Sequence, residues 1–460
     1  MSEPAGYHVS AVYFGSVYFA LHFAEGHIPF THFCFLPWVG YFWIRSVEKR
    51  KFVIHAATAL ALMILGNGAA APTLYTATFL GLLGVFFCVQ RRSGAPLANL
   101  ALVGAFGVGL SAVKFVPMLV FLASNPWIGS PGDVTPLAAL PAAFFSFNQG
   151  LFSHIDLNLP WGWHEYGAYL SPLAVILALW RLLRGARESN RTRRFKVNRA
   201  WAALALIFLI LGLGGFADWS PWSLLSELPG FASSRSPGRA FQFVLLAVGV
   251  LAGFGFDDLR AYLAEKRFSR KPALAVTVGV FILIAGVNYI LALQSLSQSF
   301  TRTPVAAEWS DEFQQSLGGK LDMYRAVREN RGALAASRLS AYQENRGLLT
   351  PSGEILPEYV LSGKMTVESR SYRGGRIEYS INAETDGEVI LGMGYDDGWT
   401  IDSPQGWTLR EEQGLLAVRF PVGENSFELV YRPPYFWIGA GISVVALLGA
   451  LLFYRRFSAA

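Results

Sequence analysis

Two histidines and a glutamate, His22, Glu25 and His27, stand together between two long apolar runs, in the stretch HFAEGHIPF. Residues 22 and 25 are one helical turn apart, so their side chains share a face if the first run is a helix. Ionisable residues at membrane depth are rare and usually face a cavity, which favours the polar rim of a pocket. The alternative is a solvated turn between two helices. A metal site is possible with two histidines and one glutamate, but it is not predicted, because these positions match no recognised ligand spacing.

Three basic residues could bind an anion. Lys114, in LSAVKFVPM, falls inside an apolar run. Its long side chain either reaches back to the interface or presents a fixed positive charge to an anionic headgroup. Arg235 and Arg239 flank a Pro-Gly pair in ELPGFASSRSPGRAFQF. Two guanidiniums suit phosphate recognition by forked hydrogen-bond donors, and the alternative is that they contact lipid phosphates at the interface.

A second polar stretch, SHIDLNLPWGWHEYG, contains His154, Asp156, His164 and Glu165. A carboxylate here could act as a general base, and Asp156 and Glu165 are retained as substrate-binding candidates. The spacing selects neither of them over the other. The tryptophans nearby are more typical of an interfacial belt than of platforms on which sugars stack.

The elements that must position these residues are apolar. The chain has 460 residues, of which 53% are hydrophobic and 15% charged, whereas soluble proteins carry roughly 25% charged residues. Apolar runs near the roughly 20 residues that a bilayer crossing needs recur along the chain, and we count about ten. The expected spans are residues 9–24, 28–45, 52–67, 73–90, 97–121, 165–183, 200–216, 239–256, 274–294 and 435–454.

Positive charges predict the orientation of these spans, because Lys and Arg near span ends are retained on the cytoplasmic side. Every second connecting segment is basic, as in RSVEKRK and RLLRGARESNRTRRFKVNR, while the intervening ones are nearly free of Lys and Arg. With about ten spans, both termini face the cytoplasm, and residues 25–27 and 125–164 face outward. The net charge of +6 is mostly a topology signal. The expected partner is therefore the lipid bilayer, and no nucleic-acid partner is expected.

Charge density rises abruptly after Ser299. Residues 1–297 form the expected membrane domain, residues 298–433 an extracytoplasmic domain, and residues 434–460 a last transmembrane helix with a cytoplasmic tail. The outer domain is expected to begin with a helix or two, over SDEFQQSLGGKLDMYRAVRENRGA, and to continue as short alternating runs between turn residues. Such runs are typical of a small antiparallel β-sandwich. The predicted fold class is thus mainly α, a polytopic membrane helical bundle with an extracytoplasmic α+β domain.

Two parts of the chain are similar to known membrane proteins. The C-terminal stretch GYDDGWTIDSPQGW, with LLAVRFPVGENSFELVYRPPYFWIGAGIS after it, resembles the end of the YfhO-like bacterial membrane proteins. The residues that carry this resemblance are Tyr395, Gly398, Trp399, Gly423, Tyr431, Pro433 and Gly439. The stretches HFAEGHIPFTHFCFLPW and LPGFASSRSPGRAF resemble the middle of large polytopic GT-C glycosyltransferases.

This resemblance implies transfer of a sugar from a polyprenyl-phosphate-linked donor on the outer face of the bacterial inner membrane. It implies a pocket at the membrane surface in which a carboxylate deprotonates the acceptor hydroxyl and cations stabilise the phosphate leaving group. Glu25 and His27 are then the catalytic candidates. The implied substrate-binding residues are His22, Lys114, Asp156, Glu165, Arg235 and Arg239. The resemblance indicates no particular cofactor.

The first outer loop departs from the GT-C pattern, because it contains no DxD or ExD and Glu25 is its only carboxylate. The chain also begins partway through that architecture. Two functions therefore stay open. One is a glycosyltransferase, with a second polypeptide supplying the missing N-terminal helices if the enzyme is split. The other is a non-catalytic membrane subunit that binds a lipid-linked glycan beside a separate glycosyltransferase. A transporter is less favoured, since the expected spans carry few ionisable residues at mid-depth.

Overall fold

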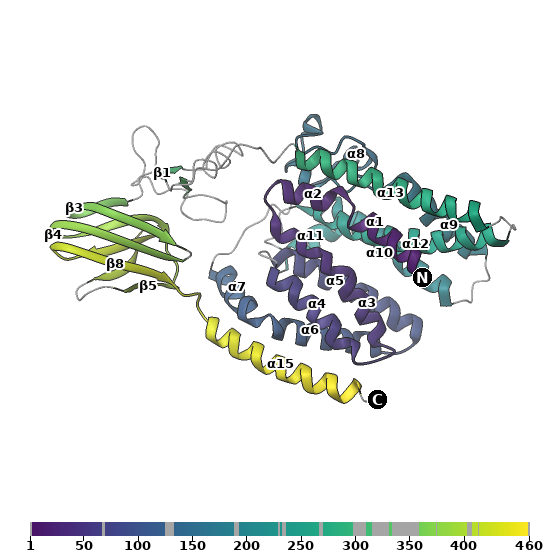
Figure 1. Cartoon of the computed structure of the whole chain (residues 1–460), viewed down its shortest axis with the longest axis horizontal. Coiled ribbons are helices and arrows are strands. Elements are labelled where there is room, and N and C mark those ends of the chain that lie inside the picture. Colours follow the sequence, from purple (N-terminus) through teal and green to yellow (C-terminus); the bar gives the residue numbers. More distant parts are fainter. Residues whose placement is uncertain are drawn as a thin grey trace. The chain divides into compact units, whose positions relative to one another are not determined.

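The structure is a computed structural model that describes residues 2–66, 70–124, 133–187, 193–228, 231, 236–265, 270–297, 310–314, 331–333, 358–373, 375–402, 407–412 and 414–458. The chain forms two compact units (Figure 1). The first unit is helical and comprises Met1–Phe115, Pro126–Thr301 and Gly439–Ala460. The second comprises Val116–Asn125 and Arg302–Ile438 and carries the strands.

Helices account for nearly all regular structure outside the strand-bearing segment. In the first third of the chain they are α1 (Glu3–Tyr13), α2 (Val17–Ala24), the 3-10 helix η1 (Ile28–Phe35), α3 (Leu36–Ser46), α4 (Phe52–Gly66), α5 (Ala70–Arg91), α6 (Ala95–Leu110), α7 (Ala112–Ser124) and α8 (Ala139–Phe145). They continue as η2 (Ile155–Leu157), η3 (Trp163–Glu165), α9 (Pro172–Arg187), α10 (Arg193–Gly212), α11 (Pro221–Ser226), η4 (Pro237–Ala240), α12 (Phe241–Glu265), α13 (Arg270–Ser297) and α15 (Phe436–Ser458).

Four helices among the described residues are long and apolar enough to cross a membrane, and the bent pair of α6 and α7 would make a fifth. The four are Thr73–Arg91, Pro237–Leu263, Val278–Ser297 and Phe436–Ser458. The expectation of about ten transmembrane helices is therefore not supported by this part of the chain. The coarser expectation holds, because several apolar helices are what a membrane-associated protein requires.

The shortfall has local causes. Residues 14–16 interrupt the first apolar run between α1 and α2, and the second run opens with eight residues of 3-10 helix before α3 begins. Helices α4 and α9 contain 15 and 16 residues, fewer than the roughly 20 that a crossing of about 30 Å needs. The axes of α6 and α7 differ by 86° where they meet at Ser111. Hydropathy predicted where apolar segments lie, but these breaks shorten the helices.

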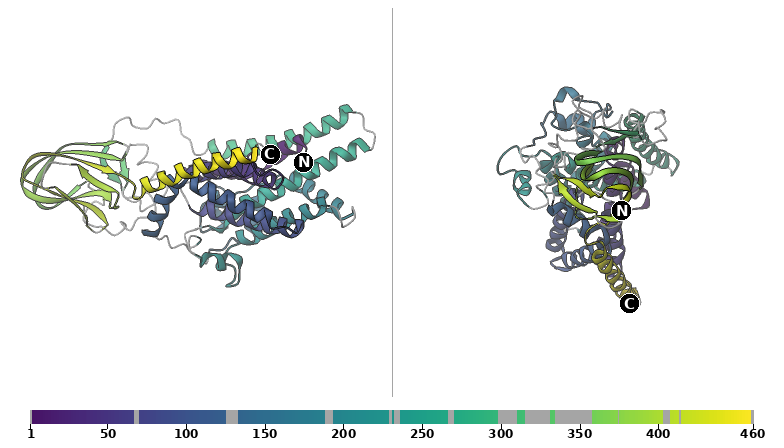
Figure 2. Two further views of the ribbon diagram at one scale, coloured as in Figure 1. Left: turned by 90° about the horizontal axis from the view of Figure 1, so that it is seen from below. Right: turned by 90° about the vertical axis from the view of Figure 1, so that its left-hand side faces the viewer.

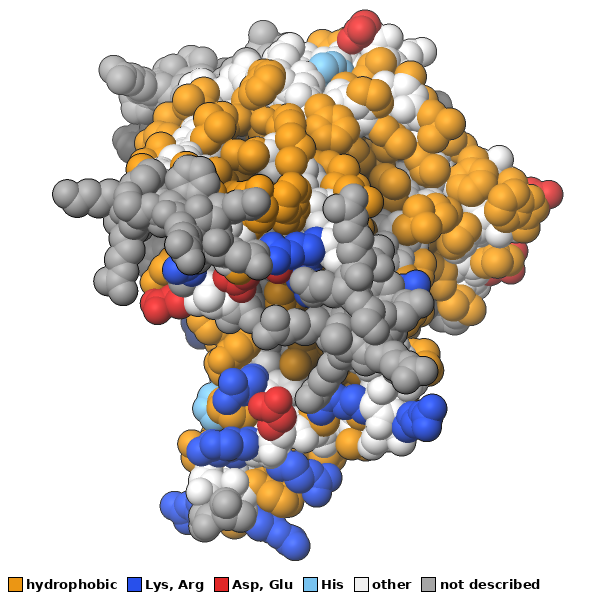
Figure 3. Space-filling model, turned by 90° about the vertical axis from the view of Figure 1, so that its right-hand side faces the viewer, with side chains coloured by type: hydrophobic (Ala, Val, Ile, Leu, Met, Phe, Trp, Pro, Cys, Tyr) orange, Lys and Arg blue, Asp and Glu red, His pale blue; other side chains and the backbone are white. Residues whose placement is uncertain are grey.

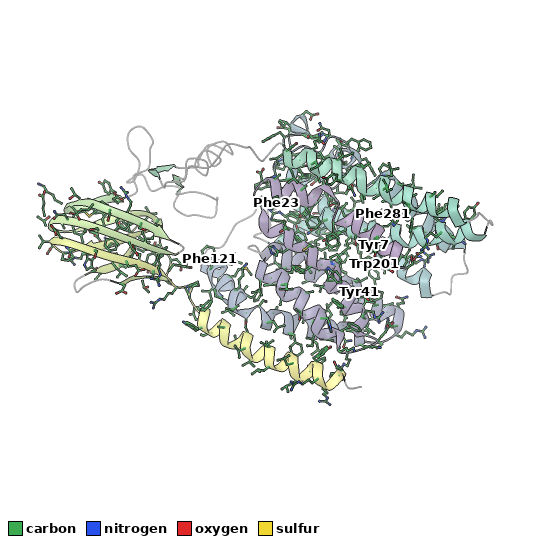
Figure 4. The ribbon with its side chains drawn as sticks, viewed as in Figure 1. Tyr7, Phe23, Tyr41, Phe121, Trp201 and Phe281 are labelled. Carbon is green, nitrogen blue, oxygen red and sulfur yellow. The ribbon has the colours of Figure 1, made fainter. Side chains whose placement is uncertain are left out.

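The outer faces of the helical unit carry large apolar side chains. Tyr7 on α1, Phe23 on α2 and Tyr41 on α3 are each more than a third exposed, and Figure 4 labels them. The long helix α15 lies along the outside of α6 in both Figure 1 and Figure 2. The ring centroids of Phe106 and Phe453 are 5.5 Å apart across this contact. An apolar surface of this kind suits a hydrocarbon environment, because lipid tails are as apolar as the side chains that meet them.

Basic residues gather at one end of the helical unit. The turn between α3 and α4, the segment between α5 and α6, and the carboxyl ends of α12 and α15 all point to that end in Figure 1. Figure 3 looks at it directly and shows Lys and Arg side chains over the lower part of the view. The basic residues of these segments include Arg45, Lys49, Arg50, Lys51, Arg92, Arg260, Arg455 and Arg456. Basic segments that alternate along the sequence thus lie at the same end of the helical unit.

The strand-bearing unit contains an antiparallel sheet, as expected. Its strands are β3 (Glu358–Arg373), β4 (Arg376–Gly394), β5 (Trp399–Asp402), β6 (Thr408–Glu412), β7 (Leu415–Phe420) and β8 (Gly423–Tyr431), and all six belong to one hydrogen-bonded sheet. The long strand β4 pairs with β3 along its length, with β8 through its first half and with β7 through its second half. Buried side chains from both halves, such as Ile381 and Leu391, join one apolar core. The prediction of an antiparallel β domain is confirmed, and its described strands form one hydrogen-bonded sheet with one apolar core, not two separate sheets.

The segment before this sheet differs from the expectation. Within SDEFQQSLGGKLDMYRAVRENRGA, the described residues form two short strands, β1 (Ser310–Gln314) and β2 (Arg331–Ala333), that pair in parallel. The sequence predicted a helix or two with loops over this stretch. The described residues are strands, and residues 315–330 lie outside the described residues.

Candidate functional site

The His–Glu cluster, defined here as His22, Glu25, His27, His164, Glu165 and Arg239, brings together three separate parts of the helical unit. His22 is in the last turn of α2, and Glu25 follows as its C-cap. Gly26 adopts a positive φ of 80°, which glycine tolerates without strain, and the backbone N–H of His27 donates to the carbonyl of His22 at 2.8 Å. This turn folds both histidines and the glutamate back toward η3 and η4.

Glu165 and Arg239 form a buried ion pair at the base of the cluster. Arg239 Nε donates to Glu165 Oε2 at 2.7 Å and Nη2 donates to Oε1 at 2.5 Å. The two side chains are 3% and 9% exposed for Glu165 and Arg239 respectively. The guanidinium also lies over the ring of Phe30, 4.9 Å from its centroid, a cation–π contact. The two parallel hydrogen bonds join one guanidinium to both oxygens of one carboxylate, so the pair fixes η3 against η4.

The ion pair controls the protonation of Glu165. Burial alone would raise the pKa of Glu165, but the charge of Arg239 and its hydrogen bonds, with the contact from His164, hold that pKa well below the usual range. An opposite charge at hydrogen-bond distance favours the ionised carboxylate more than burial disfavours it. Glu165 therefore stays negatively charged and engaged with Arg239.

His164 stands between the two carboxylates of the cluster. Its Nε2 lies 3.6 Å from Glu165 Oε1, and its Nδ1 lies 3.8 Å from Glu25 Oε1. The side chain of His164 is 7% exposed and that of Glu25 is 14% exposed. Glu25 is thus the more accessible carboxylate of the cluster, while Glu165 is enclosed. An imidazole between two carboxylates can relay a proton or be oriented by either of them.

His22 and His27 complete the cluster. Their Nδ1 atoms are 3.4 Å apart, and the ring of His22 stacks on that of Phe30 with centroids 4.2 Å apart. His22 is fully buried, and its Nε2 has no hydrogen-bond partner in the described part of the chain. Burial, followed by the proximity of His164, lowers the pKa of His27 to about 4. His27 is therefore a neutral imidazole at neutral pH.

Close backbone contacts hold η3 and η4 in place. A Cβ on Gly238 would lie 2.4 Å from the carbonyl oxygen of Glu165, and a Cβ on Gly167 would lie 2.4 Å from Leu21. Trp163 Nε1 donates to Gln149 Oε1 at 2.8 Å. Only glycine permits this approach of the two segments. In the stretch LPGFASSRSPGRAF, Gly238 therefore matters for the site as well as Arg239.

The predicted site residues divide into two sets. His22, Glu25, His27, Glu165 and Arg239 lie in the cluster. Lys114 instead donates from Nζ to the carbonyl of Leu65 at 2.7 Å, and Asp156 is exposed in η2. Neither has a hydrogen bond or ion pair to the cluster among those found in the described residues, and Arg235 lies outside the described residues.

The sequence did not single out His164. It was one of several polar side chains in its stretch, and nothing in their spacing favoured it. Its importance comes from lying between Glu25, 139 positions away in the sequence, and the adjacent Glu165. A histidine next to a glutamate was the one local signal, and it is too common to select a site.

Comparison with known proteins supports a limited relationship. No protein-family model matches the chain. The chain is 28% identical over 130 residues to a Bacillus subtilis (strain 168) protein described as "Uncharacterized protein YfhO". The match covers 27% of this chain and 14% of that relative. A YfhO-like relationship over this part of the chain is what the similarity supports.

Proposed function

We propose that the chain is a GT-C-like integral membrane protein that transfers a sugar from a polyprenyl-phosphate-linked donor to an acceptor hydroxyl. The His–Glu cluster carries this proposal, because it combines one accessible carboxylate with a buried network that orients the groups around it. The apolar helices and the partial similarity to YfhO are compatible with a membrane protein of this family.

Glu25 has the role of general base in this proposal. It would take the proton of the acceptor hydroxyl while that oxygen attacks the anomeric carbon of the sugar. The bond from the anomeric carbon to the phosphate oxygen breaks, and the polyprenyl phosphate leaves with the electron pair. Glu25 is favoured over Glu165 because its side chain is 14% exposed against 3%, and because Glu165 already accepts two hydrogen bonds from Arg239.

The remaining candidates have supporting roles. His164 would orient Glu25 from 3.8 Å, and the neutral His27 would offer a hydrogen bond to the bound substrate. Arg239 is engaged with Glu165, so it would add positive potential near the phosphate without contacting it directly. Lys114 and Arg235 remain the cations proposed to contact the phosphate, and His22 and Asp156 stay among the proposed substrate contacts.

The cluster would face the extracytoplasmic side of the bacterial inner membrane, with both termini in the cytoplasm. This assignment is supported by the position of α2, at the opposite end of the helical unit from the basic turn between α3 and α4 (Figure 1). Lys and Arg near span ends are retained on the cytoplasmic side. The strand-bearing segment would then lie outside the membrane.

A second candidate function is a non-catalytic subunit that holds a lipid-linked glycan for a separate glycosyltransferase. It is favoured by the presence of only one accessible carboxylate in the described cluster and by a match to just 14% of the YfhO relative. In that case a second polypeptide would supply the catalytic carboxylates.

The two functions are separated by a transfer assay. Purified protein in lipid nanodiscs is given lipid-linked sugar donors extracted from native membranes, and transfer is measured for wild type, Glu25→Gln and Glu48→Gln. Glu48 is an exposed carboxylate in the α3–α4 turn, outside the cluster, and serves as the control. Loss of a general base lowers the rate by about 10²–10⁴-fold, so Glu25→Gln should lose nearly all transfer and Glu48→Gln none.

Full activity of Glu25→Gln would remove Glu25 as the base. If wild type shows no transfer and a second polypeptide co-purifies at a fixed ratio, the glycosyltransferase proposal is rejected and the non-catalytic subunit is supported.

A further inference from the structure

Within the described residues, His27, His164 and Glu165 lie close enough together to hold one metal ion. Each histidine offers one imidazole nitrogen and Glu165 offers one carboxylate oxygen. These three ligand atoms lie within 4.8 Å of one another. We propose that these three residues bind a transition-metal dication of the Zn²⁺ class, with Glu25 orienting His164. This inference goes beyond the proposed sugar transfer and does not depend on it.

The distances suit a small ion. Ligand atoms about 2.0–2.1 Å from a tetrahedral Zn²⁺ lie roughly 3.3 Å from each other. His164 Nε2 and Glu165 Oε1 are already 3.6 Å apart. The third ligand atom, on His27, lies within 4.8 Å of both. A rotation of the partly exposed His27 ring would shorten that distance, and the fourth position would be left for water or a substrate oxygen.

The unpaired face of His164 supports the same assignment. His164 is 6% exposed, and its Nδ1 makes no hydrogen bond in the described part of the chain although Glu25 Oε1 lies 3.8 Å away. When a metal takes Nε2 of a histidine, the proton sits on Nδ1 and is usually donated to a carboxylate. Glu25 is placed to accept that hydrogen bond. With a metal bound, Nε2 of His164 would be a ligand and its Nδ1 would donate to Glu25.

His22 orients the other imidazole ligand. Its Nδ1 lies 3.4 Å from Nδ1 of His27, close enough for one hydrogen bond between these atoms, with either ring as the donor. With the proton on Nδ1 of His27, its Nε2 carries the lone pair that a metal requires. His22 is fully buried and stacked on Phe30, which keeps this orientation.

The charges of the cluster leave room for a dication. Counting carboxylates as charged and imidazoles as neutral, the six side chains of the His–Glu cluster sum to a formal charge of −1. A carboxylate has about four lone-pair sites, and Arg239 uses one on each oxygen of Glu165, so Glu165 can still bind a metal. Two imidazoles select Zn²⁺ or its neighbours over Mg²⁺ and Ca²⁺, which prefer all-oxygen sites.

The test is metal binding by the purified full-length protein, without any sugar donor. The protein is stripped with a chelator and titrated with Zn²⁺, with bound metal counted by mass spectrometry, and Co²⁺ is then used as a spectroscopic probe of coordination. We expect one Zn²⁺ per chain, Co²⁺ absorption of the tetrahedral type, and no displacement by excess Mg²⁺. His27→Asn and His164→Asn should each weaken binding at least about tenfold, and Glu25→Gln about 10–100-fold.

His55→Asn is the matched control, since His55 lies on α4 and contacts Lys51 and Phe42 instead of the cluster. It should bind Zn²⁺ as wild type does. Folded wild type that takes up no stoichiometric Zn²⁺, or uptake unchanged in His27→Asn and His164→Asn, would overturn the site. The absence of Zn²⁺ uptake is measured on folded wild type, so the proposal can be refuted even if a variant fails to fold.

Discussion

The buried pair of Glu165 and Arg239 gives the sharpest prediction about what holds the site together. Replacing Glu165 by Gln keeps the shape of the side chain but leaves the guanidinium without its counter-charge in an enclosed space. The amide oxygen of Gln can still accept one hydrogen bond, but its NH2 group cannot accept the other, so one hydrogen bond worth about 1.5–3 kcal/mol is lost. Breaking a buried pair by removing one partner typically destabilises by about 3–5 kcal/mol. The 2.7 Å and 2.5 Å contacts and the low exposure of both groups place this pair at the strong end. We expect a loss of about 3–5 kcal/mol in the free energy of unfolding.

The assay is equilibrium unfolding of the full chain in mild detergent, with a chelator present so that bound metal does not contribute. Glu165→Gln, Glu165→Leu and Arg239→Met should each show the loss. The double variant Glu165→Leu with Arg239→Met should recover most of it, because replacing a buried pair with apolar groups of similar size is often neutral. The exposed pair of Arg45 and Glu48, 3.9 Å apart, is the control, and Glu48→Gln should change stability by less than about 1 kcal/mol.

Two results would refute this reasoning. Glu165→Gln as stable as Glu48→Gln would mean that the pair contributes nothing to the fold around the site. Losses in the single variants that simply add in the double variant would mean that the two side chains act independently, since contacting residues should show a large interaction energy.

Three further predictions test the surroundings of the site and the second unit. Gly238→Ala should reduce stability and separate η4 from η3, because its Cβ would lie 2.4 Å from the backbone carbonyl oxygen of Glu165. Gly104→Ala is the control and should be neutral or stabilising, because a Cβ there has nothing within 4 Å. Thermal unfolding measures both variants. The hydrogen bond from Arg410 lowers the pKa of Glu388, so the stability from this pair is present above about pH 4.5 and is lost as the pH falls through the lower folded pKa. Hydrogen-exchange protection factors in β4 and β7, which are corrected for the pH dependence of the intrinsic exchange rate, should therefore fall at low pH in wild type more than in Arg410→Met. An equal fall in both proteins would contradict this prediction. Phe427→Ala should destabilise the β-core by about 3–5 kcal/mol, and full protection of β8 amides in that variant would contradict the buried position of Phe427.

The helical part of the fold could be predicted in outline but not in detail. Apolar composition predicted membrane helices, and helical segments do occupy every expected span. Their continuity was not predictable, because hydropathy averages over residues such as Gly15 and Ser16 that interrupt a helix without lowering its mean apolar character. The 86° bend at Ser111 has the same origin. In the strand-bearing unit, alternation predicted antiparallel strands, whereas the pairing of β4 with three partners depends on contacts between distant segments.

The candidate site shows the same division. The polar residues of HFAEGH were visible in the sequence because they stand between apolar runs, and Arg239 was visible because it follows a Pro-Gly pair. Their partners were not, since Glu165 meets Arg239 across 74 positions and Glu25 meets His164 across 139. Phosphate recognition was inferred for Arg239 on the assumption that its guanidinium was available. The pairing with Glu165 occupies that fork, and no local pattern could have indicated it.

The buried and the accessible halves of the cluster depend on each other. Glu165 and Arg239 fix η3 against η4, and η3 in turn sets the position of His164 relative to Glu25. A change at the buried pair should therefore disturb Glu25 without touching it. If Arg239→Met lowers metal affinity or sugar transfer while Glu25, His27 and His164 are intact, the pair acts by positioning. A loss limited to stability, with both activities unchanged in the folded fraction, would mean that the accessible half holds its geometry without support from Arg239.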